Sequence, residues 1–180
     1  ELQQLKKQIN PHFLFNMLNN ANILVKDAPD EASQILEKLD NLLRYQLNDS
    51  TRREVFLTAD IQFLTSFLEL EKVRRDHFEY TIFQEGNMEN ICIPPLLFIP
   101  FVENAVKHNL DSDNLSYVHL YFSVHNKQVT FRCENSKPRV PVKREGGIGL
   151  ANVKRRLDLL YESRYTLQIE DKETTYNVNL

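Results

Sequence analysis

The sequence contains only two cysteines, Cys92 and Cys133, and their spacing is not that of a paired metal or disulfide motif. Reduced thiols in a cytosolic compartment are therefore expected. No apolar run reaches about 18 residues, so no segment is expected to span a membrane. The formal net charge of -3 gives no reason to expect a nucleic-acid partner or a membrane-surface partner.

Glycine is also scarce, since the chain has 4 glycines in 180 residues. Three of them lie in Gly146–Leu150, directly before a predicted helix. Glycines at such a place let backbone N–H groups approach an anion, because no Cβ intervenes. The segment therefore indicates either a phosphate-binding turn or an ordinary junction between loop and helix.

Several metal and nucleotide motifs are absent. Without GxxxxGK[ST], a P-loop enzyme is excluded, and neither HExxH nor CxxC occurs. The histidines His77, His119 and His125 lack metal-ligand spacing. Apolar residues make up 42% and charged residues 26%, which are values of a globular protein. The length suits one large domain, or a small helical module followed by a domain of ordinary size.

The N-terminal part predicts a helix that reaches about Lys26. Its apolar residues form one stripe, made of Leu14, Met17, Leu18, Ala21 and Val25. His12 falls roughly opposite this stripe, with Asn16 and Asn19 beside it. Pro11 either starts the helix or kinks it. Taken alone, the pattern indicates a functional imidazole that points outward, or a surface histidine next to a proline.

A second amphipathic helix follows the turn at residues 27–30. Its apolar face comprises Ala32, Ile35, Leu36, Leu39, Leu42, Leu43 and Gln46 or Leu47. The two helices predict an antiparallel hairpin that cannot bury both stripes, so we expect it to pair with a second copy in a four-helix bundle. The polar segment 48–54 is the expected boundary between domains 1–53 and 54–180. Because the chain opens on Glu1 with a helical pattern, we expect an upstream part to be missing.

The remaining chain alternates between helices and strands. A helix opens at residues 57–60 with Thr58 as its N-cap. We expect strands at 78–84, 117–124 and 128–133, helices at 96–108 and from about 150 to 161, and a closing hairpin at 165–170 and 175–180. The predicted class is α+β: a helical hairpin in front of an α/β sandwich, whose mixed, mainly antiparallel sheet has helices on one side.

The helix 96–108 is apolar until it presents polar residues within about one and a half turns. These residues are Glu103, Asn104, Lys107 and His108. An amide oxygen of Asn104 is a reasonable Mg²⁺ ligand, and Lys107 would supply charge for the same phosphates. The alternative is a helix C-terminus at which Lys and His interact favourably with the negative end of the macrodipole and have no further role.

Basic residues also occupy the loop 135–145, which predicts either closure over phosphates or a solvated segment. They are Lys137, Arg139, Lys143 and Arg144. A further basic run, Lys154 to Arg156, is expected on a helix surface.

Three stretches together resemble the cytoplasmic core of LytS-type sensor histidine kinases. They read QINPHFLFN, PPLLFIPFVENAVKH and GGIGLANVKRRLDLLY, and they occur in the order found in that family. The resemblance implies a dimerising helical hairpin and an ATP-binding domain of the gyrase, Hsp90 and MutL type. It implies His12 as the phospho-acceptor and Asn104 as the ligand of the Mg²⁺–nucleotide. It also implies nucleotide contacts by Glu103, Lys107, His108, Asn135, Gly147, Gly149 and Leu150.

Two departures from the family pattern stand out. The acidic DxGxG that reads the adenine amino group appears here as NSKPR, with neither glycine. Asn135 can accept a hydrogen bond from that amine, but its own NH₂ must find an acceptor. His12 is followed by Phe13 where many other histidine kinases have an acid. The first departure leaves open an alternative, a catalytically weak nucleotide-binding and dimerisation module that regulates a partner by conformation.

The resemblance predicts phosphoryl transfer from Mg·ATP to His12, whose ring Asn16 would hold in one tautomer. The segment 48–54 would act as the hinge that lets the nucleotide domain reach His12. The phosphoryl group would then pass to an aspartate of a response regulator with a LytTR-type DNA-binding output domain. The chain itself is expected to bind no nucleic acid. It would be the cytoplasmic domain of a bacterial inner-membrane protein, attached to the membrane only through upstream segments.

Overall fold

The computed structural model describes residues 11–109, 114–138 and 148–180. These residues form two compact units. The helical unit comprises residues 11–76 and 90–96, and the sheet unit comprises the described residues of 77–89 and 97–180. This division into two units follows the contacts between residues. It does not test whether residues 1–53 and 54–180 fold independently, so the predicted domain boundary stays a prediction.

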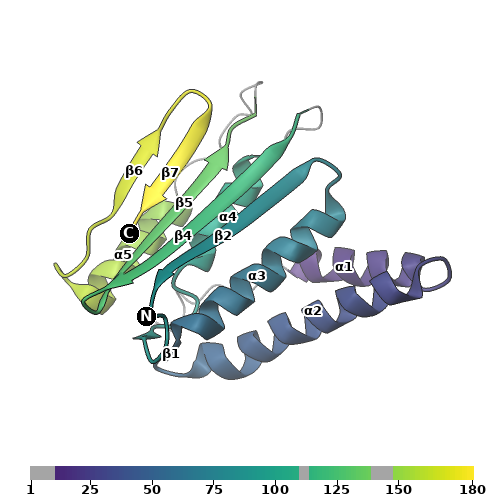
Figure 1. Cartoon of the computed structure of the whole chain (residues 1–180), viewed down its shortest axis with the longest axis horizontal. Coiled ribbons are helices and arrows are strands. Elements are labelled where there is room, and N and C mark those ends of the chain that lie inside the picture. The colour runs from purple at the N-terminus through teal and green to yellow at the C-terminus, as the bar shows by residue number, and fades with distance from the viewer. Residues whose placement is uncertain (1–10, 110–113, 139–147) are drawn as a thin grey trace. The chain divides into compact units, whose positions relative to one another are not determined.

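The helical unit contains α1 (Pro11–Leu24), α2 (Pro29–Asn48) and α3 (Leu57–Arg74). Helices α1 and α2 pack against each other as a hairpin, and α3 packs on α2 (Figure 1). The start of α2 suits its sequence, because Pro29 occupies the first turn and Asp30 and Glu31 face the positive end of the macrodipole. The described part of the predicted hairpin is confirmed.

The buried stripe of α1 differs from the predicted one. Phe13, Met17 and Ala21 are buried, whereas Leu18 and Val25 are 48% and 51% exposed. The Phe13 ring lies 5.2 Å from the ring of Phe67 in α3, so the α3 contact determines which face of α1 turns inward. The predicted stripe was therefore rotated, because the sequence pattern held no information about α3.

Helix α2 likewise has two apolar faces. The inner one contains Ala32, Ile35, Leu39, Leu42 and Tyr45. The other apolar residues of the predicted face are exposed: Leu36, Leu43 and Leu47. Both helices of the hairpin thus keep an apolar face that no other described part of the chain covers.

A short antiparallel ribbon leads into α3. Its strands are β1 (Val55–Phe56) and β3 (Cys92–Ile93), and the Leu57 N–H donates to the Ile91 carbonyl over 2.8 Å. A 3₁₀ turn, η1 (Asp49–Thr51), precedes the ribbon. The prediction of Thr58 as N-cap is wrong, because α3 begins at Leu57 with the extended Phe56 in the cap position. The start of α3 is positioned by the hydrogen bonds of this ribbon, and its N-cap residue makes no side-chain capping hydrogen bond.

The sheet unit is built on five strands in the order β2-β4-β5-β7-β6. Their bounds are β2 (Phe78–Gly86), β4 (Ser116–His125), β5 (Gln128–Ser136), β6 (Gln168–Asp171) and β7 (Thr175–Asn179). Strands β2 and β4 are parallel, and every other neighbouring pair is antiparallel. The predicted α+β class, with a mixed and mainly antiparallel sheet, is confirmed.

Helices α4 (Ile99–His108) and α5 (Ile148–Tyr161) cover one face of this sheet (Figure 1). Four buried rings form the core beneath α4, with Phe98 lying 4.5 Å from Phe131 and 5.3 Å from Phe122, and Phe101 lying 5.9 Å from Phe131. Rings at these separations bury large apolar areas in favourable tilted arrangements. The predicted start of α4 at Leu96 is wrong, because Leu96 has a φ of 56° and the helix begins three residues later.

Two tight backbone features set the strand ends. Asn126 and Lys127 have φ values of 51° and 64° and connect β4 to β5 as a two-residue turn, with His125 paired to Gln128. Gly86 ends β2 with a φ of 87°, and a Cβ there would lie 2.2 Å from the Val124 carbonyl oxygen. Only glycine fits this position without displacing backbone.

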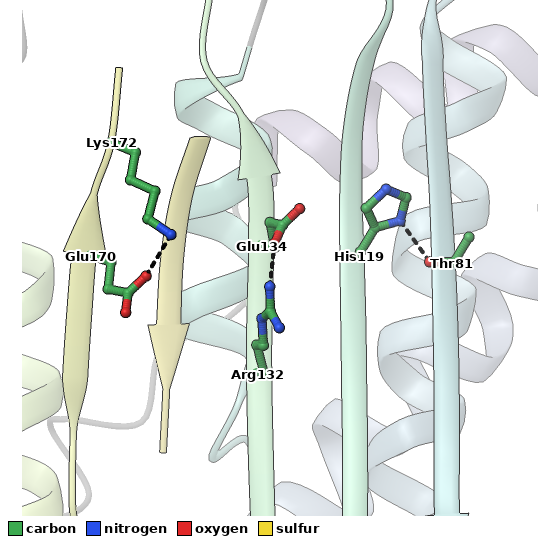
Figure 2. A network of polar contacts seen from close by, with 6 residues as sticks. All are labelled: Thr81, His119, Arg132, Glu134, Glu170 and Lys172. Carbon is green, nitrogen blue, oxygen red and sulfur yellow. Dashed lines mark hydrogen bonds and ion pairs between the residues drawn. The ribbon is translucent and has the colours of Figure 1, made fainter. Parts of the chain in front are cut away.

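The opposite face of the sheet carries several polar pairs (Figure 2), beside the exposed rings of Phe83 and Tyr121. The Thr81 hydroxyl lies 2.6 Å from His119 Nδ1, and Arg132 pairs with Glu134 over 2.5 Å. Lys172 pairs with Glu170 over 3.0 Å at the far edge. Because neighbouring residues of a strand face opposite ways, Glu134 belongs to this polar face and Asn135 to the helix-covered face.

Candidate functional site

His12 lies in the first turn of the described part of α1 and is exposed to solvent. The amide nitrogen of Asn16 lies 3.3 Å from its Nδ1 atom. The two residues are four positions apart, which places them one above the other on a helix. His12 therefore points outward with Asn16 beside it, as the sequence predicted.

The polar cluster of α4 lies at the end of a helix whose other face is buried. Val102, Ala105 and Val106 face the core. Of the predicted residues, Glu103, Asn104 and His108 are half-buried and Lys107 is exposed. Lys107 and His108 occupy the last turn, so the macrodipole explanation of these two residues also fits.

Asn135 lies in β5, on the face of the sheet against which α4 packs. Its side chain is 2% exposed, and its Nδ2 donates to the Ser136 carbonyl oxygen over 2.8 Å. The expected requirement for an acceptor of its NH₂ group is thus met by the next peptide unit.

Helix α5 contacts α4. Gly149 lies in the first turn of α5, and Leu150 beside it is half-buried. Free backbone N–H groups at the start of a helix attract anions. Gly147, together with Arg139, Lys143 and Arg144 of the preceding loop, lies outside the described residues.

Two basic residues differ from expectation. The ammonium of Lys137 donates to Asp171 Oδ1 over 2.9 Å and to the Lys172 carbonyl over 2.6 Å, so it ties β5 to the turn between β6 and β7. Arg156 was expected on a helix surface but is 5% exposed, because its side of α5 is the buried side that also carries Val153 and Leu157.

The sequence interpretation missed Asn109. This residue follows the last residue of α4, is fully buried, and donates from Nδ2 to the Tyr117 carbonyl over 3.0 Å. It therefore ties the end of the polar cluster to β4. An asparagine directly after an apolar helix pattern is a helix-end signal, and that signal was available in the sequence.

The predicted residues fall into two groups. His12 and Asn16 belong to the helical unit, whereas Asn104, Asn135 and Gly149 belong to the sheet unit. Among the described residues, no cluster of three or more His, Cys, Asp or Glu side chains is suited to hold a metal ion. None of the helices in the described ranges has the length and apolar character needed to cross a membrane.

Similar sequences support the resemblance to histidine kinases. Residues 1–78 match the model of the family described as histidine kinase. The sensor protein LytS of Staphylococcus haemolyticus is 29% identical over 96% of this chain and 32% of its own length. The sensor histidine kinase YpdA of Escherichia coli is 33% identical over 61% of this chain and 20% of its own length. The chain spans about a third or less of these curated relatives.

Solved structures share the fold. The catalytic domain of histidine kinase ThkA superposes with a TM-score of 0.51 at 16% identity, covering 71% of this chain and 94% of that domain. The histidine kinase domain of a blue-light activated kinase from Erythrobacter litoralis has a TM-score of 0.51 at 17% identity, covering 94% of this chain and 93% of that domain. The match of residues 1–78 to the histidine kinase family and the LytS relatives support a LytS-type histidine kinase, and the solved structures show that the fold is shared.

Proposed function

We propose that this chain catalyses transfer of the γ-phosphoryl group of Mg·ATP to a ring nitrogen of His12. The lone pair of the ring nitrogen forms the new N–P bond while the bond between the γ-phosphorus and the bridging oxygen breaks, ADP leaves with the electron pair, and the ring proton passes to solvent. The observation that carries the proposal is the solvent-exposed imidazole beside Asn16 on a helix whose inner face, with Phe13, Met17 and Ala21, is buried. A neutral imidazole is already a nucleophile near neutral pH and requires chiefly placement.

The nucleotide would bind on the helix-covered side of the sheet unit. Asn104 offers an amide oxygen to Mg²⁺, which prefers oxygen ligands and keeps waters and phosphates in its shell. Asn135 offers a polar side chain for the base, and the first turn of α5 with Gly149 offers backbone N–H groups for the phosphates. Contact between α4 and α5 supports one site for the three, with Glu103, Lys107, His108 and Leu150 as further contacts. Bound Mg²⁺ would neutralise phosphate charge during the transfer.

The exposed apolar faces of the hairpin support a homodimer. Leu18 of α1, Val25 directly after this helix, and Leu36, Leu43 and Leu47 of α2 are between 38% and 71% exposed. A second copy would cover these side chains in a four-helix bundle. We further propose that the phosphoryl group passes to an aspartate of a response regulator with a LytTR-type output domain. The chain would act as the cytoplasmic part of a longer membrane sensor.

A second function rests on one observation, the buried Asn135 in place of an acidic residue. The NH₂ group of Asn135 already donates to the Ser136 carbonyl, and its neutral amide oxygen would accept a weaker hydrogen bond from the adenine amino group than a carboxylate would. On this alternative the chain binds nucleotide without transferring phosphate and regulates a partner by conformation.

Incubation with γ-labelled ATP and Mg²⁺ separates the two functions. We expect acid-labile, base-stable label on the wild-type chain, and its loss in His12→Gln and in Asn104→Ala. The matched control is His125→Gln, because His125 is also exposed but lies on β4, where it should not matter. Thermal unfolding of each variant reports folding. Nucleotide binding without label would favour the regulatory module.

A further inference from the structure

A series of three hydrogen bonds crosses the sheet unit from the end of α4 to Asn135. The side-chain NH₂ of Asn109, the residue directly after α4, donates to the Tyr117 carbonyl of β4 over 3.0 Å. The Tyr117 N–H donates to the Ser136 hydroxyl of β5, also over 3.0 Å. The Ser136 carbonyl accepts the NH₂ of Asn135 over 2.8 Å. We call these three bonds the Asn109–Asn135 path.

The path lies where polar groups depend on their partners. Asn109 is fully buried, Asn135 is 2% exposed and Ser136 is half-buried. A partner removed at such a place leaves a polar group with little access to water, which is costly. The Ser136 hydroxyl also extends the strand ladder, because the last paired residues of β4 and β5 at this end are Val118 and Asn135. A side chain thus continues the ladder for one more residue.

Helix α4 is held against the sheet at both ends. Near its beginning, the ring of Phe101 lies 5.9 Å from the ring of Phe131 in β5. After its last residue, Asn109 bonds to β4. A helix fixed at two points carries its side chains at fixed places over the sheet. The separation between Asn104 in α4 and Asn135 in β5 is therefore set by the aromatic core at one end and by the path at the other.

We propose that Asn109 and Ser136 are positioning residues that hold the two halves of the nucleotide site at a fixed separation. This inference rests on the proposed function, in which Asn104 serves the Mg²⁺–phosphate half and Asn135 the base half. A ligand that reaches both halves gains affinity from their fixed separation, because its second contact is intramolecular once the first is made. The role requires no contact of Asn109 or Ser136 with the nucleotide.

Ligands that reach one half or both halves test this role. The probes are adenosine for the base half, magnesium tripolyphosphate for the phosphate half and Mg·ATP for both, with dissociation constants measured by NMR titration. In Ser136→Ala we expect the Kd of Mg·ATP to rise about tenfold, the equivalent of one hydrogen bond, and the Kd of each partial ligand to stay within about twofold of wild type. Ser136→Thr keeps the hydroxyl and should restore the affinity for Mg·ATP. An equal loss for all three ligands, or no loss for Mg·ATP, would overturn the proposal.

The serial arrangement makes a sharper demand. Asn109→Ala should also raise the Kd of Mg·ATP about tenfold, and its combination with Ser136→Ala should raise it no further, because either change breaks the same path. A loss of about a hundredfold in the double variant would show two independent effects and would overturn the path. If Asn109→Ala fails to fold in thermal unfolding, Ser136→Ala and its threonine rescue decide the question.

The matched control is Ser116→Ala. It removes a hydroxyl at the start of the same strand, whose bond of 2.9 Å ends on the His77 carbonyl and leads away from the path. That carbonyl keeps the Ser116 N–H as a donor, also over 2.9 Å. The Kd of Mg·ATP should therefore stay within about twofold of wild type, and a tenfold rise would contradict the specific role of Ser136.

A measurement without nucleotide separates failure of the path from failure of the proposed function. We expect amide hydrogen exchange in the last turn of α4 to become faster in Ser136→Ala and to stay unchanged in Ser116→Ala. Unchanged exchange in Ser136→Ala would overturn the path. A wild-type chain that binds none of the three ligands would count against the proposed function, and hydrogen exchange would still decide the path.

Discussion

The side-chain NH₂ of Asn135 donates to the carbonyl oxygen of the very next residue, Ser136, over 2.8 Å. The amide is buried on the helix-covered face of β5, where a donor without an acceptor would be costly. The family pattern has a carboxylate at this position. In this chain the neighbouring backbone group is the Ser136 carbonyl, an acceptor, so it suits an amide NH₂ at position 135 and not a carboxylate.

Restoring the acid should therefore destabilise the fold. In Asn135→Asp a carboxylate oxygen would face the Ser136 carbonyl, and we expect a loss of about 1–3 kcal/mol in the free energy of unfolding at neutral pH. Urea unfolding followed by circular dichroism measures this loss. The control is Asn179→Asp, at a half-exposed position of β7, which should change stability by less than about 0.5 kcal/mol. Equal stability of the two variants would refute the expectation.

The contact between Asn16 and His12 predicts a kinetic effect without a structural one. Asn16→Ala removes the neighbour of Nδ1 from an exposed helix surface, so melting temperature should hardly change. The labelling rate of His12 should fall roughly fivefold to tenfold, because the ring loses one orienting hydrogen bond. Asn19→Ala, on an exposed position of the same helix, is the matched control. A wild-type rate in Asn16→Ala would remove Asn16 from the mechanism.

The exposed leucines of the hairpin predict an oligomeric state. A charge at Leu18 or Leu43, which are 48% and 38% exposed, would have to be desolvated in a dimer but costs little in a monomer. We expect Leu18→Glu and Leu43→Glu to shift the chain from dimer to monomer in sedimentation equilibrium. Leu159→Glu changes a 46% exposed leucine of α5 and should leave the dimer intact. A dimer that survives all three changes would use another surface.

The two cysteines should react differently. Burial raises the pKa of Cys133 to about 12, so its thiol stays protonated in the folded chain, whereas Cys92 is exposed. Iodoacetamide near pH 8 should modify Cys92 alone, and both thiols after unfolding in guanidinium, as peptide mass spectrometry would record. Because the folded state raises this pKa, the thiol contributes stability that is present at neutral pH and lost as pH rises from about 9 toward 12. Rapid alkylation of Cys133 in the native chain would contradict its burial.

Gly86 should be among the least replaceable positions of the sheet. Gly86→Ala would combine a φ of 87° with a Cβ 2.2 Å from the Val124 carbonyl oxygen. We expect a loss of about 3 kcal/mol in the free energy of unfolding, measured by thermal and urea denaturation. Gln84→Ala, at an exposed position of the same strand, should stay within about 0.5 kcal/mol of wild type.

Local patterns predicted the elements of this fold, and long-range contacts decided the details that they missed. Aromatic and β-branched residues predicted β2, alternating residues predicted β4 and β5, and the polar cluster coincided with the end of α4. The start of α4 escaped prediction because Leu96 takes its conformation beside the carboxylate of Asp60, thirty-six positions earlier.

The same limit applies to faces and to the candidate site. The inner face of α1 was mistaken because it depends on Phe67 of a later helix, and the burial of Arg156 depends on the packing side of α5. For the site, helix spacing predicted the position of Asn16 beside His12, whereas the roles of His12 and Asn104 came from the family resemblance and stay predictions. No sequence signal showed that Lys137 would be engaged by the turn between β6 and β7.

The two-residue turn at Asn126 and Lys127 sets the register between β4 and β5. A hairpin this short allows a single alignment of its strands, and that alignment sets inward and outward alternation along all of β5. Inserting one residue into the turn would exchange the two sides of the strand, sending Asn135 to the solvent and Glu134 into the phenylalanine core. The adenine side of the proposed pocket is thus specified about ten residues away, by two left-handed residues at the tip of a loop.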